Sequence, residues 1–205
     1  MPVVGVIVLA AGGSRRLGTP KQLLRDASGE TLITRAVQTA VASVCRPVVA
    51  VLGAAEDAIR PALDGLPVTV AVNPDWQTGM AGSLQVGLTA LGEVDAALVM
   101  LCDQPGVTQA LLNSLVDTYH STGHALIACE YGGTLGVPAL FARSLFPELM
   151  ALRGEQGARR ILQSYAGPLA RVPFAEGLSD VDTAADMARL GLTERPPRPN
   201  SGEPD

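Results

Sequence analysis

The stretch Val3-Val4-Gly5-Val6-Ile7-Val8-Leu9-Ala10-Ala11-Gly12-Gly13-Ser14-Arg15-Arg16-Leu17-Gly18-Thr19-Pro20-Lys21 lies at the start of the chain and decides its fold. Its first seven residues form a continuous apolar run rich in β-branched side chains, which is typical of a strand buried on both faces of a parallel sheet. The small residues that follow allow backbone N–H groups to approach phosphate oxygens closely. The stretch therefore predicts a buried strand that ends in an anion-binding loop.

Further apolar runs alternate with segments of helical spacing along the first two thirds of the chain. The predicted strands are Val3–Leu9, Pro47–Leu52, Val68–Val72, Ala96–Leu101 and Ala125–Cys129, and the predicted helices are Leu32–Val44, Ala55–Leu63, Ser83–Leu91 and Thr108–Tyr119. This alternation predicts an α/β fold with a Rossmann-like, doubly wound, mostly parallel sheet and helices on both faces. After Cys129, glycines and Pro138 favour a hairpin or crossover. Helices are expected at Ala142–Leu152, Gly157–Tyr165 and Thr183–Leu190.

Composition limits the classes of protein that fit. With 205 residues, 47% of them hydrophobic, the chain suits one domain, which we expect over residues 1–192, with residues 193–205 as a disordered tail. Apolar runs are too short to cross a membrane, and no basic signal-peptide region follows Met1. A net charge of −5 and 3% aromatic residues argue against a nucleic-acid surface. The chain has an odd number of cysteines, Cys45, Cys102 and Cys129. We expect them to be buried apolar residues in a protein of the reducing cytoplasm.

The first loop carries an unusual basic residue. Lys21 is the only lysine of the chain, and the other fourteen basic residues are arginines. Arg16 and Lys21 follow the carboxyl end of the first strand, where open α/β sheets bind ligands, so either could neutralise a triphosphate or a leaving pyrophosphate. The alternative is a solvated basic loop. The loop matches neither the Walker A pattern nor G-x-G-x-x-G.

The sequence from Leu9 to Lys21 closely resembles the signature loop of the MobA-like nucleotidyltransferases, and among them the molybdenum cofactor cytidylyltransferases. The resemblance extends from the first strand to about Asp186. It implies a fold of the nucleotidyltransferase type, with Arg16 and Lys21 as catalytic residues on the phosphates. The implied nucleotide-binding positions in this loop are Leu9, Ala10, Ala11, Gly12, Gly13, Ser14 and Lys21.

Asp103 follows the predicted strand Ala96–Leu101 at the carboxyl edge of the sheet, where a hard cation can bridge protein and triphosphate. Mg²⁺ usually takes one or two carboxylates and completes its shell with water and phosphate. The alternative is that Asp103 caps the next turn. Cys-Asp-Gln-Pro after an apolar strand resembles the metal motif of the same family, which implies that Asp103 is a metal ligand and a catalytic residue.

A second pair of carboxylates, Asp180 and Asp182, precedes the last predicted helix. Thr183 and Asp186 match a capping box, so a purely structural reading of this segment stays open. The segment resembles the Asp-x-Asp-Thr element of the family, from which a second metal ligand comes. We expect Asp182 to be that ligand, with Asp180 as the second choice.

The loop before the predicted helix Ser83–Leu91 also has two readings. Ser83 can serve as the cap of that helix. The sequence Gly-Met-x-x-Ser-Leu resembles the nucleoside-contacting loop of the family, which implies that the Gly82 backbone and the Ser83 side chain bind ribose or base. Trp76 is more typical of a packing anchor than of a stacking surface. Segment 131–141 resembles the acceptor side of these enzymes, and segment 154–159 resembles a family stretch in which Glu155 replaces aspartate.

The resemblance implies a Mg²⁺-dependent transfer of CMP from CTP to the phosphate of molybdopterin, with the product passed to a molybdenum hydroxylase. Ala10-Ala11, where guanylyltransferases typically have Ala-Gly, favours CTP over GTP. Three alternatives remain: GMP transfer, nucleotidyl transfer to another small phosphate, and a cofactor-binding chaperone without catalysis. Arg16, Lys21 and Asp103 together argue against a chaperone, because a carrier needs no groups for a leaving pyrophosphate.

Overall fold

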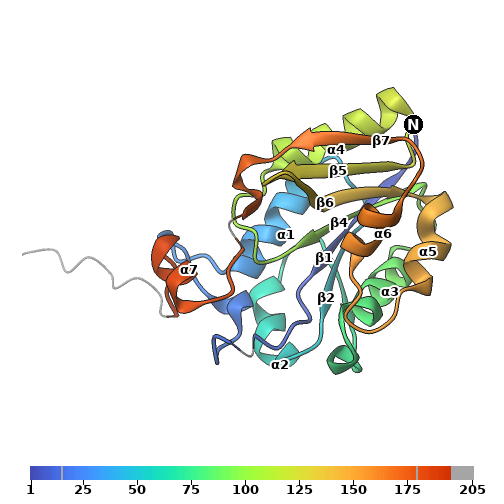
Figure 1. The fold of residues 1–205 in the computed structure, drawn as a ribbon. Helices are drawn as coiled ribbons and strands as arrows, with labels where there is room; N and C mark the ends of the chain where they lie inside the picture. The colour runs from blue at the N-terminus through green and yellow to red at the C-terminus, as the bar shows by residue number, and fades with distance from the viewer. Residues whose placement is uncertain (15, 179, 195–205) are drawn as a thin grey trace, which may run out of the picture.

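The computed structural model describes residues 1–14, 16–178 and 180–194 and is built around a seven-stranded sheet of order β3-β2-β1-β4-β6-β5-β7 (Figure 1). In this described part, neighbouring strands are parallel except around β6, which runs antiparallel to both β4 and β5. The strands are β1 (Val4–Leu9), β2 (Val48–Leu52), β3 (Thr69–Val72), β4 (Ala96–Leu101), β5 (Leu126–Tyr131), β6 (Thr134–Ala142) and β7 (Leu169–Pro173).

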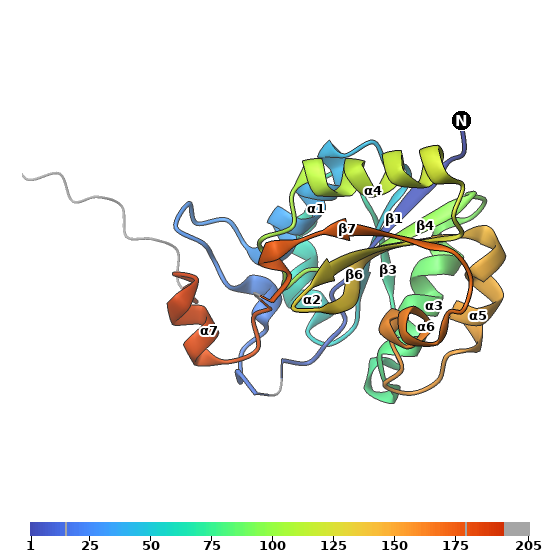
Figure 2. The same cartoon turned by 45° about the horizontal axis from the view of Figure 1, so that its top comes forward.

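Helices cover both faces of the sheet (Figure 2). Side chains of β1 alternate between two cores: Val6 and Val8 pack with α1, α2 and α4, whereas Ile7 and Leu9 pack with α3, α5 and α6. The predicted doubly wound, mostly parallel α/β sheet is therefore confirmed. The helices are α1 (Leu32–Ala42), α2 (Glu56–Ile59), α3 (Met80–Leu91), α4 (Gln109–Thr122), α5 (Phe146–Ala151), α6 (Ala158–Ser164) and α7 (Ala184–Arg189).

Helix α3 begins three residues before its predicted start. Gly79, with φ of 117°, separates a 3₁₀ turn at Trp76–Thr78 from Met80, and a side chain at Gly79 would overlap the Gly154 backbone. Ser83 therefore lies inside α3, and its interpretation as the helix cap is wrong. The close backbone approach at Gly79 fixes this start, and the local sequence does not reveal that approach.

The segment after β5 is a hairpin, which resolves the choice between hairpin and crossover. Gly132 and Gly133 have φ of 56° and 72°, the left-handed conformation that a type I′ hairpin turn requires at both of its central residues. Strand β6 extends to Ala142, so the helix predicted over Ala142–Leu152 starts late, with a 3₁₀ turn at Arg143–Leu145 before α5. Strands β6 and β7 were not predicted as separate strands.

A C-terminal arm, residues 180–194, packs beside the first loop rather than on the sheet (Figure 2). Val181 and Leu192 from the arm form a small apolar cluster with Leu24 and Leu32, separate from the two main cores. The backbones of Thr193 and Arg25 exchange hydrogen bonds of 2.7 and 2.8 Å. The arm is thereby tied to the segment after Lys21. Of the predicted disordered tail 193–205, residues 195–205 lie outside the described residues.

All three cysteines are buried and free, as expected for apolar packing residues. Within the described residues, every helix is too short or too polar to span a membrane.

Candidate active site

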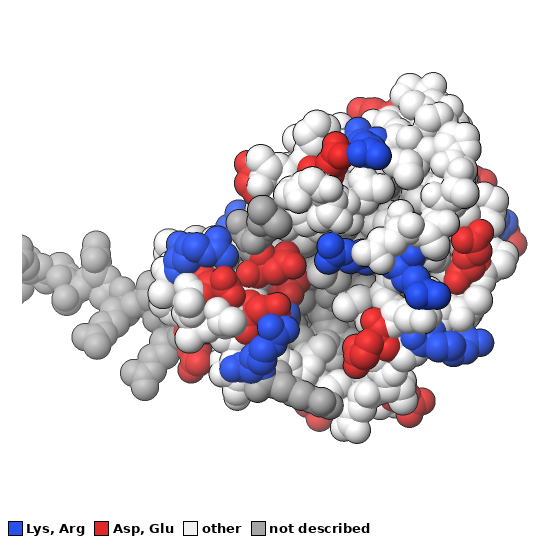
Figure 3. Space-filling model, viewed as in Figure 1, with Lys and Arg blue, Asp and Glu red and all other residues white. Residues whose placement is uncertain are grey.

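A cavity of ≈ 400 Å³ opens at the carboxyl ends of β1 and β4. Figure 3 shows the face that carries it, with acidic side chains gathered beside a hollow and basic side chains around it. Open α/β sheets bind ligands at this edge. Among the predicted site residues, those that line the cavity are Leu9, Ala10, Ala11, Gly12, Gly13, Ser14, Arg16, Lys21, Ser83, Asp103 and Asp182.

The loop after β1 is held in place by hydrogen bonds from a buried side-chain amide. Gln22 is 1% exposed, and its Nε2 donates to the carbonyls of Ala10 and Gly12 at 2.8 Å each. The Ser14 hydroxyl accepts from the backbone N–H of Lys21 at 3.0 Å and donates to Gln22 Oε1 at 3.4 Å. Gln22 was not among the predicted site residues, because its neighbours in sequence do not reveal that it turns under the loop.

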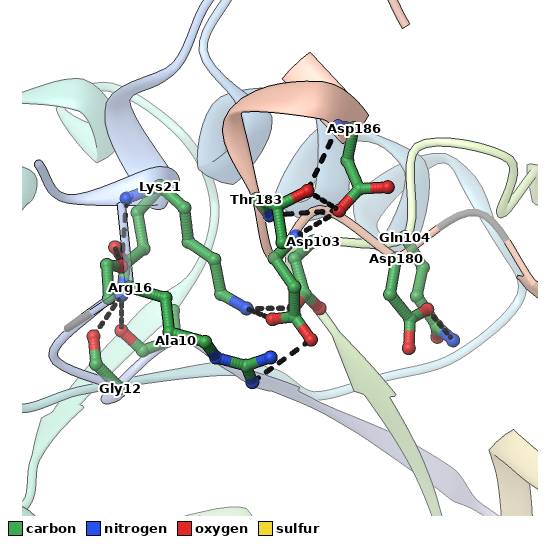
Figure 4. A network of polar contacts seen from close by, with 12 residues as sticks. Ala10, Gly12, Arg16, Lys21, Asp103, Gln104, Asp180, Thr183 and Asp186 are labelled. Carbon is green, nitrogen blue, oxygen red and sulfur yellow. Dashed lines mark hydrogen bonds and ion pairs between the residues drawn. The ribbon is translucent and has the colours of Figure 1, made fainter. Parts of the chain in front are cut away.

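Lys21 lies between two carboxylates that are distant in sequence (Figure 4). Its ammonium donates to Asp103 Oδ2 and, at 3.2 Å, to Asp182 Oδ1. The side chains of Lys21 and Asp103 are 17% and 9% exposed, whereas that of Asp182 is 42% exposed. The Arg16 guanidinium pairs with the other oxygen of Asp182 at 3.2 Å. Four predicted residues therefore form one charged network.

The charge state of Lys21 follows from its neighbours. Burial favours the neutral amine, but the carboxylates of Asp103 and Asp182 outweigh this effect and raise the pKa of Lys21 above its ordinary value. The side chain therefore remains an ammonium at neutral pH. A buried cation at the end of the first loop can neutralise phosphate oxygens.

Asp180 has a different environment from Asp182. Its Oδ1 accepts a hydrogen bond of 3.0 Å from Gln104 Nε2, on the side of the network away from Arg16 (Figure 4). Burial raises the pKa of Asp180, and the negative charges of Asp103 and Asp182 raise it further. Three carboxylates thus lie near one another along this edge of the sheet.

The capping box predicted for Thr183 and Asp186 is present. The Thr183 hydroxyl accepts from the backbone N–H of Asp186, whose carboxylate accepts from the N–H of Thr183 at 2.9 Å. These bonds involve neither Asp180 nor the side chain of Asp182. The structural role of Thr183 and the placement of Asp182 in the charged network therefore coexist.

Ser83 and Gly82 lie on different surfaces. The Ser83 hydroxyl lines the cavity and accepts a hydrogen bond of 3.0 Å from buried Asn73 Nδ2. Gly82 borders a separate hollow with Asn73 and Thr78. Trp76 is half-buried and packs among the apolar residues of the α3 face, as a packing anchor does, and it also lines the cavity.

The two carboxylates on Lys21 fit a divalent cation. Asp103 and Asp182 converge on a single positive group, which is the arrangement that a hard cation and its bound phosphates need. Among the described residues, no group of three or more His, Cys, Asp or Glu side chains could hold a metal. A metal at Asp103 and Asp182 would therefore take its other ligands from water and phosphate.

Comparisons with known proteins find relatives that align with most of the chain. Nicotine blue oxidoreductase of Paenarthrobacter nicotinovorans is 29% identical over 198 residues, covering 93% of this chain and 97% of that protein. A probable molybdenum cofactor guanylyltransferase of Mycobacterium ulcerans is 29% identical over 88% of this chain and 90% of its own length.

Solved structures extend the similarity to three dimensions. Rv0371c of Mycobacterium tuberculosis superposes with a TM-score of 0.77 and 33% identity, covering 93% of this chain and 98% of that chain. A second structure of that protein is a complex with manganese, with a TM-score of 0.74, 31% identity and the same coverage. The MobA-like NTP transferase domain matches residues 6–169. The chain therefore belongs to the family of MobA-like NTP transferases.

Proposed function

We propose that this protein is a Mg²⁺-dependent nucleotidyltransferase that moves CMP from CTP to the phosphate of molybdopterin and releases pyrophosphate. The observation that carries the proposal is the Lys21 ammonium held between Asp103 and Asp182, directly beside a loop of small residues. This arrangement combines an anion-binding loop, a cation for phosphate charge and two carboxylates for a hard metal ion.

In the proposed reaction, an oxygen of the acceptor phosphate attacks the α-phosphorus of the nucleotide. The bond between that phosphorus and the bridging oxygen breaks, and its electron pair leaves with pyrophosphate. An acceptor phosphate is already ionised at neutral pH, so positioning and electrostatic stabilisation supply most of the acceleration. A divalent metal held by Asp103 and Asp182 would supply positive charge against the α-phosphate and the leaving group.

Each residue of the network has a distinct task in this scheme. Asp103 and Asp182 would hold the metal, and the loop from Leu9 to Ser14 would bind the nucleotide. Lys21 and Arg16 follow the charge as it moves towards pyrophosphate. Ser83, whose hydroxyl accepts a hydrogen bond from Asn73 and which lines the cavity, would contact the nucleoside.

Two further features support the finer assignment. Ala10-Ala11 favours CTP, with GTP as the alternative, and the relatives named for the molybdenum cofactor support a molybdopterin-type acceptor. A molybdenum hydroxylase would receive the product. Three free, buried cysteines suit a cytoplasmic protein.

Pyrophosphate release tests the proposal directly. Pure protein is incubated with Mg²⁺, molybdopterin and each of CTP, GTP, ATP and UTP in turn. We expect release that requires molybdopterin and is fastest with CTP. Equal or faster release with GTP would make the protein a guanylyltransferase. Molybdopterin binding without any release would make it a chaperone, and release only with another phosphorylated acceptor would change the substrate.

A further inference from the structure

The hydrogen bonds of the first loop are divided unequally between its carbonyl and N–H groups. The carbonyls of Ala10 and Gly12 each accept from Gln22 Nε2 at 2.8 Å, and the carbonyl of Ala11 accepts from the N–H of Ala54 at 3.0 Å. The N–H groups of Ala11 and Gly12 have no acceptor among the described residues. From Ala10 to Gly12, the backbone groups that remain available to a ligand are therefore N–H donors.

This polarity suits one class of ligand atom. Phosphate oxygens and the carbonyl or ring-nitrogen acceptors of a nucleobase accept hydrogen bonds, and an unpaired backbone carbonyl beside them would repel their negative charge. Glycines at 12 and 13 allow their peptide groups to rotate, so the sequence of the loop does not by itself determine which way its dipoles point.

Gln22 is the residue able to determine this orientation. It is 1% exposed, and one amide nitrogen binds two carbonyls that are two residues apart. Its Oε1 accepts from Ser14, whose hydroxyl also accepts from the Lys21 N–H. The amide therefore connects the loop backbone to the residue that carries the phosphate-binding ammonium.

We propose that Gln22 is a positioning residue that makes the nucleotide loop a hydrogen-bond donor surface. By binding the Ala10 and Gly12 carbonyls, it keeps the Ala11 and Gly12 N–H groups available for acceptor atoms of the nucleotide. This inference rests on the proposed function, because it takes the ligand of this loop to be a nucleoside triphosphate.

The main test is Gln22→Met, which keeps the length and neutrality of the side chain and removes its donor. We expect roughly ten- to hundredfold weaker binding of Mg²⁺–CTP by calorimetry and a matching rise in KM. Binding of Mn²⁺ alone should stay unchanged, because Asp103 and Asp182 are intact. A merely structural role would lower the thermal midpoint without this selective loss.

Gln85→Met is the matched control. Gln85 Nε2 also donates to two backbone carbonyls, those of Met150 and Leu152 at 2.9 and 3.0 Å, but outside the loop. We expect this variant to lose thermal stability and to bind Mg²⁺–CTP as the wild type does. Equal CTP affinity in wild type and Gln22→Met would overturn the inference, and so would equal losses of affinity in Gln22→Met and Gln85→Met.

Ser14→Ala keeps the test decisive if Gln22→Met does not fold. It removes a half-buried hydroxyl that braces Gln22 and Lys21. We expect a few-fold loss of CTP affinity, and an unchanged affinity would then refute the inference. If the wild type binds none of the four triphosphates, the proposed function and this inference both fail. If the wild type binds CTP and the variants bind it equally, only this inference fails.

Discussion

The two halves of the sheet are built differently, and the candidate site lies at the carboxyl ends of β1 and β4 in the first half. Strands β3, β2, β1 and β4 are all parallel and are connected through helices, whereas β6 and β5 form an antiparallel hairpin beside β7. In Figure 1 the first half runs from blue to green and the second from yellow to orange. The first half carries the loop, Lys21 and Asp103, and the chain after the second half returns to supply Asp180 and Asp182.

This difference indicates how binding and chemistry are divided. The proposed phosphate-binding loop and Lys21 need only generic groups at strand ends, which consecutive βαβ units place at one edge. The second carboxylate, Asp182, comes from the arm, which packs through Val181 and Leu192 against Leu24 and Leu32. Variants in the first half should therefore weaken binding of the nucleotide and its metal. Variants in the arm should instead displace Asp182 relative to Asp103.

Asp103→Asn should have the largest effect, because Asp103 lies at the end of β4 where the halves join. We expect turnover to be abolished with the fold intact, since the change removes the negative charge of the proposed metal ligand without emptying a core position. Steady-state kinetics measures the turnover, and circular dichroism checks the fold. Asp95→Asn, just before the start of the same strand, is the control and should keep near-normal activity. Near-normal activity of Asp103→Asn would remove this residue from the site.

Lys21→Arg should come next, although the formal charge is unchanged. A flexible ammonium fits between Asp103 and Asp182, whereas a planar guanidinium is larger and favours a bidentate contact. Losing one well-placed charge contact typically costs about 10²–10³ in kcat. Lys21→Ala should be at least as damaging.

Arg60→Lys is the control for the lysine variants. It alters an exposed pair with Glu56 on α2 and should stay within a few-fold of wild type. Unchanged kcat/KM for both Lys21 variants would mean that Lys21 is a solvated loop residue.

The two carboxylates of the arm should differ in their effect on metal binding. Asp182→Asn should weaken Mn²⁺ binding in the presence of CTP by roughly tenfold or more, because Asp182 shares a cation with Asp103. Asp180→Asn should change it only a few-fold, since Gln104 already donates to Asp180. Electron paramagnetic resonance of Mn²⁺ gives both affinities. The reverse order would make Asp180 the ligand.

Thr183→Ala should have the smallest effect, by loosening α7 and with it the arm. Loss of a threonine helix cap typically costs about 1 kcal/mol, so we expect a few-fold drop in kcat from a less well-placed Asp182. Thr108→Ala removes the equivalent cap of α4 and is the control for stability alone. Equal activity of Thr183→Ala and Thr108→Ala would contradict this prediction and show that the Thr183 cap does not contribute to the function of the arm.

The capping box also has a predicted pH dependence. Hydrogen bonds from Thr183 and Arg189 lower the pKa of Asp186 to about 2. Because the folded pKa lies below the unfolded value of about 3.9, this stabilisation is complete above that value and is lost as the pH falls towards 2. Asp186 should therefore stay ionised between pH 5 and 7. Over this range the hydrogen-exchange rates of the α7 amides, corrected for intrinsic exchange, should not change through Asp186.

Much of the first half was predictable from sequence because its signals are local. Buried parallel strands are continuous apolar runs, and β1, β2 and β4 begin and end within one residue of their predicted bounds. The second half gave weaker signals. Gly136 and Pro138 interrupt β6, and β7 is an edge strand in which only Val172 is buried, so neither shows a clear apolar run.

The candidate site divides in the same way. The sequence alone determined that a loop of small residues, a solitary lysine and an aspartate after a buried strand would share one sheet edge, because parallel strands align their carboxyl ends. Only the tertiary structure decided that Lys21 meets Asp182, 161 residues away, and that Gln22 turns beneath the loop. Both depend on packing between distant segments, since Val181 and Leu192 seat the arm against Leu24 and Leu32. Such packing leaves no periodic pattern in the chain.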